Sequence, residues 1–414
     1  MSEELLKNSN TDRIDLISNK WKKRKLKYIC SSKTTNISTE NITDDATKYK
    51  VFGASGLMGY IESKGSDNDY IGIVKDGAGA GRLDFYPANS SLLGTMAYII
   101  PNQNTNLKWL MYTMQSLNLG DSIDKTTIPH IYFSEYGNNY VCYPSLEEQT
   151  KIANFLDEKI SQIDNAISKT KKSIEEYKKL KQSIITEAVT KGLDPNVEMK
   201  DSGNIHIGQC PKHWEVKKFK YIAKSLFKGN GISKEEVYED GDINCVRYGE
   251  IYTKYNEDFD KCFSKTKLDD KKTQIHINEG DILFSGTGEL IEEIGKNVVY
   301  MGKKDCLAGG DIIVCKHTHN PIFLNYSLNS SYSQEQKSKG KAKLKVVHIS
   351  ASEIGNIVVP LPPREEQDKI AKYLKEKSIE LSRIISNKEK IIEELEQYKK
   401  SLIYEYVTGK KEVA

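Results

Sequence analysis

Two stretches of the chain place apolar residues at the alternating three and four spacing of a long amphipathic helix. The apolar positions of the first stretch are Ile163, Ile167, Ile174, Tyr177, Ile184 and Ala188, and those of the second are Leu381, Ile385, Ile392, Leu395, Leu402 and Tyr406. A sustained seam of this period predicts a coiled coil. Because helices that are so polar elsewhere need a partner, we expect the two to pack on each other antiparallel.

The two stretches are copies of one sequence. The first copy opens Pro-Ser-Leu-Glu-Glu-Gln-Thr-Lys-Ile-Ala at Pro144, and the second opens Pro-Pro-Arg-Glu-Glu-Gln-Asp-Lys-Ile-Ala at Pro362. They align without a gap over about 47 residues, a long internal repeat that fixes the architecture. Ser145 with Glu148 predicts a capping box at the first helix start. A helix of about 45 residues would be roughly 65 Å long.

The repeat divides the 414 residues into globular block, helix, globular block, helix. We predict a first globular domain over 1–143 and a long helix over 144–192. A linker and second globular domain then occupy 193–361, and a second long helix occupies 362–414. The predicted fold class is α/β (α+β), with two globular domains separated by two long helices in an antiparallel, pseudo-twofold coiled coil.

Both globular blocks show a strand-and-turn pattern. Short apolar runs rich in β-branched and aromatic residues predict strands at 70–74, 96–100, 281–284, 298–300 and 311–314. One helix is expected over 107–119 and another over 325–336. Each block begins with a tryptophan, Trp21 or Trp214, interpreted as a packing anchor among surface lysines. Beyond that start the two blocks show no clear likeness, so we expect them to recognise different things.

The bulk composition narrows the class of protein only slightly. The formal net charge of +3 neither favours nor excludes nucleic acid, because a local basic face matters more than the total. The seven cysteines are scattered without a C-x-x-C pair, which is typical of a reduced, cytoplasmic protein. No run approaches the length of a membrane span, and the N-terminus has no apolar signal region.

Two glycine-rich segments are candidate loops. Gly77-Ala-Gly-Ala-Gly-Arg82 lacks the Gly-Lys-Ser/Thr of a phosphate-binding loop. We interpret it as a turn that lets backbone approach a surface, with Lys75 and Arg82 as candidate phosphate or base contacts. The segment 286–289, Gly-Thr-Gly-Glu, is a weaker candidate of the same kind.

The second block carries a basic loop over 337–345, in which lysines alternate with small residues. Lysines there would act mainly through phosphates, giving affinity rather than sequence choice; the alternative is a solvated charge run. Arginine and tyrosine at 247–248 suit base edges. The DNA-contact candidates of this block are Lys228, Arg247, Tyr248, Lys254, Lys337, Lys339, Lys341 and Lys343.

Motifs for catalysis or metal binding are weak. Asn320-Pro-Ile-Phe323 faintly resembles the Asn-Pro-Pro-Tyr/Phe loop of amino-methyltransferases, but its third residue differs and no cofactor-binding glycine motif accompanies it. His317 and His319 lie near Cys315, where a surface turn is the simpler interpretation than a metal site. We therefore expect no catalytic residue, no metal and no cofactor in this chain.

Taken together, several segments resemble the specificity subunit of type I restriction-modification systems. The repeated Pro-x-x-Glu-Glu-Gln-x-Lys-Ile-Ala start joins Gly-Leu-Asp-Pro-Asn-Val at 192–197, Met-Lys-Asp-Ser-Gly at 199–203 and Pro-Lys-His-Trp-Glu at 211–215. Further on come Gly-Asp-Ile-Leu-Phe-Ser at 280–285 and Lys-Val-Val-His-Ile at 345–349. The resemblance covers nearly the whole chain. It departs at Trp21, which lacks the proline that Pro211 supplies before Trp214.

The resemblance implies a non-catalytic subunit that recognises double-stranded DNA. Each of two target recognition domains would read one half of a split, asymmetric target, and the helices would set the spacer between the halves. The helices would also dock two modification (methyltransferase) subunits, which bind S-adenosylmethionine. Restriction subunits using ATP and magnesium would join that core in bacterial defence. The alternative is a coiled-coil scaffold with protein-binding globular ends.

Overall fold

The computed structural model describes residues 6–11, 14–18, 21–124, 128–268, 273–288, 290–341 and 347–413. The chain forms two compact units, each of which combines a globular domain with one stretch of both long helices. The first unit holds residues 1–171 and 389–414, and the second holds 172–388. No described helix is long and apolar enough to cross a membrane.

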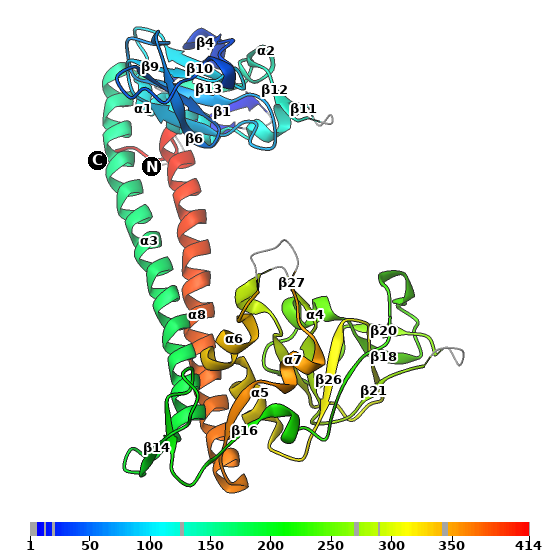
Figure 1. Ribbon diagram of the computed structural model, residues 1–414. Helices are drawn as coiled ribbons and strands as arrows, with labels where there is room; N and C mark the ends of the chain where they lie inside the picture. The colour runs from blue at the N-terminus through cyan, green and yellow to red at the C-terminus, as the bar shows by residue number, and fades with distance from the viewer. Residues whose placement is uncertain are drawn as a thin grey trace. The chain divides into compact units, whose positions relative to one another are not determined.

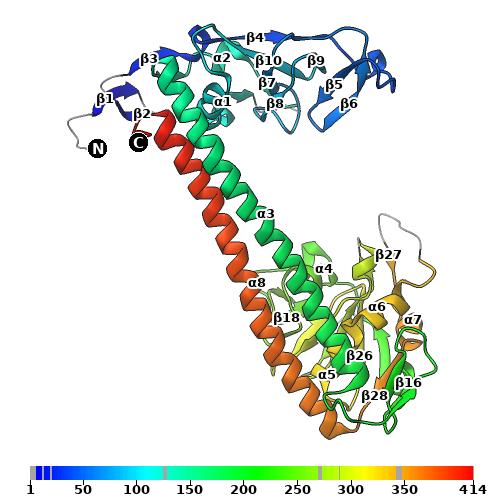
Figure 2. The same ribbon diagram turned by 90° about the vertical axis from the view of Figure 1, so that its left-hand side faces the viewer.

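The long helices are α3 (Leu146–Lys191) and α8 (Arg364–Val407), which lie side by side in Figures 1 and 2. In the first unit Phe155 packs on Tyr406, and Asp164 bonds the Lys399 ammonium at 2.7 Å. In the second unit the Lys388 ammonium lies 5.5 Å from the Tyr177 ring centroid. Along these contacts, residues with higher numbers on α3 meet residues with lower numbers on α8. The two helices therefore run antiparallel.

The helix pair repeats its contacts in the two units. Lys181 donates to the Ser382 hydroxyl in the second unit, and Lys399 bonds Asp164 in the first. In the sequence repeat, Lys181 corresponds to Lys399 and Ser382 to Asp164. Of the proposed seam, Ile163, Ile167, Ile174, Leu381 and Leu402 are buried, while Tyr177, Ile184, Ile385, Ile392 and Leu395 are half-buried. Lys181 and Lys399, at matched positions of the repeat, therefore both make polar contacts across the helix pair.

The first globular domain contains a four-stranded sheet in the order β4-β10-β7-β8 and a three-stranded sheet in the order β6-β5-β9. Its strands are β1 (Leu6–Thr11), β2 (Ile14–Ser18), β3 (Lys22–Lys25), β4 (Cys30–Thr34), β5 (Tyr49–Gly53), β6 (Gly56–Ile61), β7 (Tyr70–Val74), β8 (Leu83–Tyr86), β9 (Ser90–Leu92), β10 (Met96–Pro101), β11 (Ile123–Asp124), β12 (His130–Ile131) and β13 (Tyr140–Tyr143). Its helices are α1 (Leu107–Ser116) and α2 (Phe133–Tyr136).

The second globular domain has a five-stranded sheet, β17-β26-β22-β24-β19, and a four-stranded sheet, β20-β18-β25-β21. Its strands are β14 (Met199–Asp201), β15 (Gln209–Pro211), β16 (Glu215–Lys218), β17 (Ser225–Lys228), β18 (Ile243–Val246), β19 (Asp258–Phe259), β20 (Ser264–Thr266), β21 (His276–Ile277), β22 (Ile282–Ser285), β23 (Thr287–Gly288), β24 (Asn297–Tyr300), β25 (Cys306–Ala308), β26 (Ile312–Lys316), β27 (Val347–His348) and β28 (Val358–Leu361). Its helices are α4 (Tyr248–Thr253), α5 (Pro321–Asn329), α6 (Ser331–Ser338) and α7 (Ala351–Gly355).

The two globular domains share one topology, which corrects the expectation of no likeness beyond the tryptophan. The order β4-β10-β7-β8 matches β17-β26-β22-β24, and β6-β5-β9 matches β20-β18-β25. In both small sheets the middle strand pairs antiparallel with one neighbour and parallel with the other. Strand β3 pairs with β13 as β16 pairs with β28. A shared topology needs only matching apolar patterns, so it survives where sequence likeness does not.

Each domain is fixed to the start of a long helix by the same set of contacts. The indole of Trp21 donates to Glu148 at 3.3 Å, and that of Trp214 donates to Glu366 at 2.8 Å. The buried Gln149 accepts from the backbone N–H of Asn106 at 2.8 Å, and Gln367 accepts from that of Asn320 at 3.0 Å. Asn106 caps α1 and Asn320 caps α5. The tryptophan therefore anchors each domain, as the sequence predicts.

The predicted short elements are mostly confirmed. The structure has strands at all five predicted positions, with bounds shifted by two residues at most. The predicted helix over 325–336 is wrong as one element, because Ser330 is extended and separates α5 from α6. The helix predicted over 107–119 ends at Ser116, and Leu119 begins a 3-10 turn instead. The capping box of Ser145 and Glu148 is confirmed by reciprocal hydrogen bonds.

Candidate nucleic-acid interface

The glycine-rich loop of the first domain connects β7 to β8. Gly77 and Gly81 have φ of +93° and +86°, a region that favours glycine, and a Cβ at Gly77 would meet no atom within 4 Å. The loop therefore has open space beside its backbone at Gly77, whereas Gly81 lies against the side chains of Leu119 and Ile123. Lys75 precedes it and Arg82 follows it, and the Arg82 side chain is exposed. Both residues predicted to contact DNA in this domain thus flank one hairpin loop.

A histidine holds this loop from the side. His130 on β12 forms a β-bridge with Asp76, and its Nδ1 lies 2.8 Å from Asp76 Oδ1. The other carboxylate oxygen of Asp76 lies 3.0 Å from the Lys75 ammonium. Tyr132 stacks on the His130 ring at 6.2 Å between centroids and is exposed. The loop base therefore combines a lysine, a histidine and an exposed aromatic ring, groups suited to phosphate and base contacts.

The glycine-rich loop of the second domain lies at the matching topological position, between β22 and β24. Thr287 and Gly288 form β23, which pairs with β27. The Thr287 hydroxyl lies 3.1 Å from Nδ1 of His348. In this domain too, a histidine on a short strand therefore holds the glycine-rich loop.

Two lysine candidates of the second domain, Lys228 and Lys341, lie near this loop. The Lys228 ammonium pairs with Asp311 at 2.7 Å, and the backbone carbonyl of Asp311 accepts from the Gly286 N–H at 2.6 Å. The Lys341 ammonium donates to the His348 carbonyl at 2.6 Å and pairs with Glu353 at 2.7 Å. Lys339 is exposed nearby in the chain. Lys228 and Lys341 therefore reach the base of the loop from opposite chain segments.

Helix α4 and its two cap residues carry three further candidates. Tyr248 is 41% exposed, and the exposed Lys254 lies 5.5 Å from the Phe263 ring centroid. A Cβ at Gly288 would meet the Tyr252 hydroxyl at 2.8 Å, so α4 lies against the glycine-rich loop. The Arg247 guanidinium faces inward, 3.5 Å from the buried Glu250. Tyr248 and Lys254 thus suit an outward contact better than Arg247 does.

The expectation for Lys337 is wrong. This residue is 2% exposed, and its ammonium donates to the carbonyls of Gly295 and Leu328 and to the Asn297 side chain. Burial lowers the pKa of Lys337 to about 7. A side chain so placed supports the segment before β24 and cannot reach a phosphate. Its place at the end of helix α6, rather than in a loop, explains the error. Lys343 lies outside the described residues.

The two loop-holding histidines are the functional candidates that the sequence reasoning missed. The repeat continues upstream of Pro144 and Pro362, to His130 and His348. The residues shared over this extension are His-Ile at 130 and 348, Ser-Glu at 134 and 352, Gly-Asn at 137 and 355, and Val at 141 and 359. Extending the alignment of the helix repeat toward the N-terminus would have found them.

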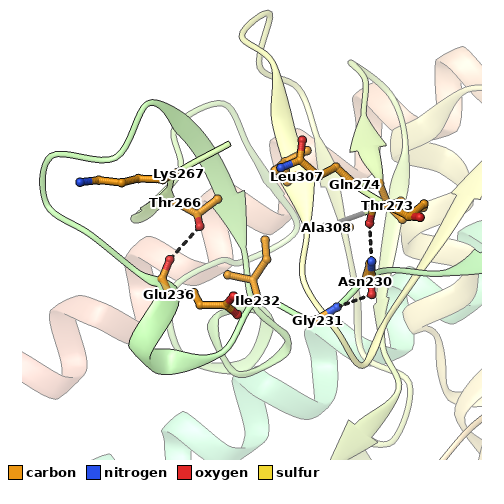
Figure 3. Close-up of a pocket in the computed structure, with 11 residues that line it drawn as sticks. Asn230, Gly231, Ile232, Glu236, Thr266, Lys267, Thr273, Gln274, Leu307 and Ala308 are labelled. Carbon is orange, nitrogen blue, oxygen red and sulfur yellow. Dashed lines mark hydrogen bonds between the residues drawn. The ribbon is translucent and has the colours of Figure 1, made fainter. Parts of the chain in front are cut away.

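A small pocket of the second domain lies between the chain after β17, strand β20 and strand β25 (Figure 3). The Asn230 amide donates to the Thr273 carbonyl, and the Thr266 hydroxyl donates to the Glu236 carbonyl at 2.7 Å. Its volume of about 40 Å³ would hold a few water molecules and is too small for a base. This pocket is therefore part of the frame and not a nucleotide site.

The weaker motifs take structural roles. Asn320 caps α5. His317 is half-buried, and burial lowers its pKa to about 4. Among the described residues, no group of three or more His, Cys, Asp or Glu side chains is placed to hold a metal ion.

Sequence comparison places the chain beside known proteins. The model of the family described as "Type I restriction modification DNA specificity domain" matches residues 18–176 and 211–397. The Type I restriction enzyme MjaVIII specificity subunit of Methanocaldococcus jannaschii is 28% identical over 83% of this chain and 79% of its own length. The putative MjaX specificity subunit of the same organism is 26% identical over 89% of this chain and 80% of its own.

The fold is also similar to a solved structure. A chain described in work on "complex assembly and conformational transition of the type I R-M system" superposes with a TM-score of 0.71. The match covers 95% of this chain and 99% of the other, at 14% sequence identity. At this identity the likeness concerns the fold alone.

Proposed function

Since this chain belongs to the family of type I restriction-modification DNA specificity domains, and its role is DNA-sequence recognition, we propose that each globular domain reads one half of a bipartite, asymmetric target. The observation that carries this proposal is the pair of glycine-rich loops at one topological position in two domains that share a topology but differ in sequence. A shared frame would present both loops to DNA in the same way. Unlike side chains around the loops would then select different bases.

Some of the candidate contacts suit binding affinity, and others suit the selection of bases. The lysines at 75, 228, 339 and 341 suit phosphates, because a lysine is a flexible point charge. Arg82 and Tyr248 offer groups that suit base edges or base stacking. We therefore propose that the lysines position each domain and that Arg82 and Tyr248 contribute to the choice of bases.

The helix pair has two proposed roles. It sets the unread spacer between the half-sites, since half-sites on one DNA face lie about 34 Å apart per helical turn. It also docks two copies of one modification subunit. Both helices are described throughout, and Leu180 and Tyr398 mark the only repeat position that is apolar and exposed in both copies, at 47% and 54%. A large exposed apolar side chain at matched positions suits two equal contacts with a partner protein.

The chemistry is proposed to belong to the partners. The chain itself would be non-catalytic, as the name specificity subunit of its relatives suggests. Modification subunits would bind S-adenosylmethionine and methylate adenine, and restriction subunits would use ATP and magnesium. We place the assembly in the cytoplasm, where the DNA of a bacterial or archaeal cell lies and where seven free cysteines stay reduced.

The test is co-expression of the chain with a type I modification subunit, followed by sequencing of the host DNA for methylated adenine. We expect one split motif with two unlike halves. A contiguous palindrome would contradict the two-domain reading. An assembled complex that binds no DNA specifically would favour a coiled-coil scaffold with protein-binding globular ends.

A further inference from the structure

Two cysteines of the second domain lie close enough to react with each other. The Cys262 and Cys306 sulfur atoms are 3.4 Å apart. Cys306 is the first residue of β25 and is fully buried, while Cys262 is half-buried in the connection between β19 and β20. The two residues are distant in the chain, so a bond between them would tie that connection to the sheet.

We propose that Cys262 and Cys306 form a dithiol site that peroxide oxidises to a disulfide, and that this bond changes how the second domain reads DNA. The claim about DNA rests on the proposed function; the claim about the disulfide does not. The surroundings favour this pair over the other cysteines. Cys30 has its sulfur 3.4 Å from the Leu26 carbonyl, and burial raises its pKa to about 12. Burial likewise raises the pKa of Cys245 and of Cys315 to about 12.

The environment of the pair also indicates which cysteine reacts with the oxidant and which one resolves the product. The Cys262 and Cys306 sulfur atoms share a hydrogen bond, and this contact lowers the pKa of Cys262. The same contact, together with burial, raises the pKa of Cys306. The half-exposed Cys262 is thus the thiolate that an oxidant reaches first, and Cys306 is the resolving thiol.

The reaction balances with hydrogen peroxide as oxidant. The Cys262 thiolate attacks one peroxide oxygen, the O–O bond breaks, and Cys262 sulfenic acid and hydroxide form. The Cys306 sulfur then attacks the Cys262 sulfur, the S–O bond breaks, and water leaves with the thiol proton. The hydroxide takes a proton from solvent, so two thiols and one peroxide give one disulfide and two water molecules.

The connection that would be tied carries part of the candidate interface. Phe263 follows Cys262, is 65% exposed, and lies beneath the Lys254 ammonium. Its backbone N–H donates to the Tyr255 hydroxyl at 3.1 Å, and the Tyr255 ring stacks on Phe259 with centroids 3.9 Å apart. A disulfide would therefore restrict Phe263 and, through its contact with that ring, Lys254 at the C-terminal end of helix α4.

The test uses the full chain, treated with hydrogen peroxide and then returned to reducing conditions. We expect the oxidised chain to lose two of its seven free thiols, a peptide map to show one Cys262–Cys306 bond, and dithiothreitol to restore both thiols. Cys245→Ala, which removes a neighbouring buried thiol, should still form the bond, and Cys262→Ser should not. Sulfinic acid at Cys262 without a disulfide, or a bond to Cys245, would overturn the site.

The second arm measures DNA reading by the complex with modification subunits, before and after oxidation. We expect oxidation to lower methylation of the target motif several-fold in the wild-type complex. In the complex that carries Cys262→Ser, oxidation should leave methylation of the motif unchanged. Should the disulfide form while methylation stays the same, the effect on recognition is overturned and the proposed function stands. Should the reduced complex show no split motif, the proposed function fails and the dithiol remains.

Discussion

The two globular domains differ most in the segments that contribute least to the shared frame. The frame is common to both: matching sheets, a tryptophan bonded to a glutamate, and a glutamine that holds the cap of the next helix. Around the glycine-rich loop the domains agree in part: in each, a histidine on a short strand holds the loop. Among the described residues, the second domain alone adds helix α4 beside this loop. This division teaches that one scaffold can carry two different recognition surfaces.

The largest expected effect concerns the shared anchor. Trp21→Ala and Trp214→Ala should each lower the free energy of unfolding of their own domain by about 3–5 kcal/mol, because each removes a large buried ring and leaves a cavity. Chemical denaturation with hydrogen exchange resolved by domain would measure it. If one substitution costs less than about 1 kcal/mol, the two anchors are not equivalent.

A second prediction concerns the buried Lys337 of the second domain. Lys337→Met should lower the free energy of unfolding of the second domain by about 1–3 kcal/mol, because it leaves the Gly295 and Leu328 carbonyls without their donor. The exposed Lys339 gives the matched control, Lys339→Met, which should change stability by less than about 0.5 kcal/mol.

The pH dependence of this pair follows from the lowered pKa of Lys337, about 7 when folded against an ordinary 10.5. Below about 7 both states hold the proton, and its contribution is constant. Between these values the unfolded chain binds more protons, so the folded state gains stability as pH rises. The free energy of unfolding of wild type should therefore increase relative to that of Lys337→Met between pH 7 and about 10. A constant difference across that range would rule out a lysine that is neutral when folded.

A third prediction concerns the helices. Leu180→Ser and Tyr398→Ser should each weaken one of two partner contacts, by about 1–3 kcal/mol, because each truncates an exposed apolar side chain proposed as an anchor. Native mass spectrometry of the complex should show one modification subunit lost from either variant and both lost from the double variant. Ser183→Ala, on an exposed neighbouring turn of α3, is the control. Full occupancy in the double variant would move docking elsewhere.

The smallest effect is expected at the lysines. Lys75→Ala and Lys228→Ala should weaken DNA binding about equally at all sequences, because a phosphate contact carries no base information. The slope of log affinity against log salt should fall by about 1 for each lost phosphate contact. An unchanged slope would place that lysine outside the interface.

How much the sequence could predict depends on the range of the signal. The helices and the capping box of Ser145 follow from local periodicity and spacing, and the structure confirms them. The shared topology of the domains could not be predicted, because it lies in strand pairing between distant segments. Lys337 was misjudged because its burial depends on acceptors from Gly295 and Leu328, which no local pattern reveals.

The candidate interface divides in the same way. Lys75 and Arg82 are close in sequence to the glycine-rich loop, so local reasoning could place them there. The loop-holding His130 and His348 were within reach of the repeat alignment, had it been extended upstream. The approach of Lys228 and helix α4 to the second loop required the fold.

The most direct test of one frame with two readers is the adenine methylation map of complexes carrying Arg82→Ala or Tyr248→Ala. The first substitution should relax bases only in one half of the motif, and the second only in the other half, with the spacer unchanged in both. A substitution that alters both halves, or the spacer, would contradict the account.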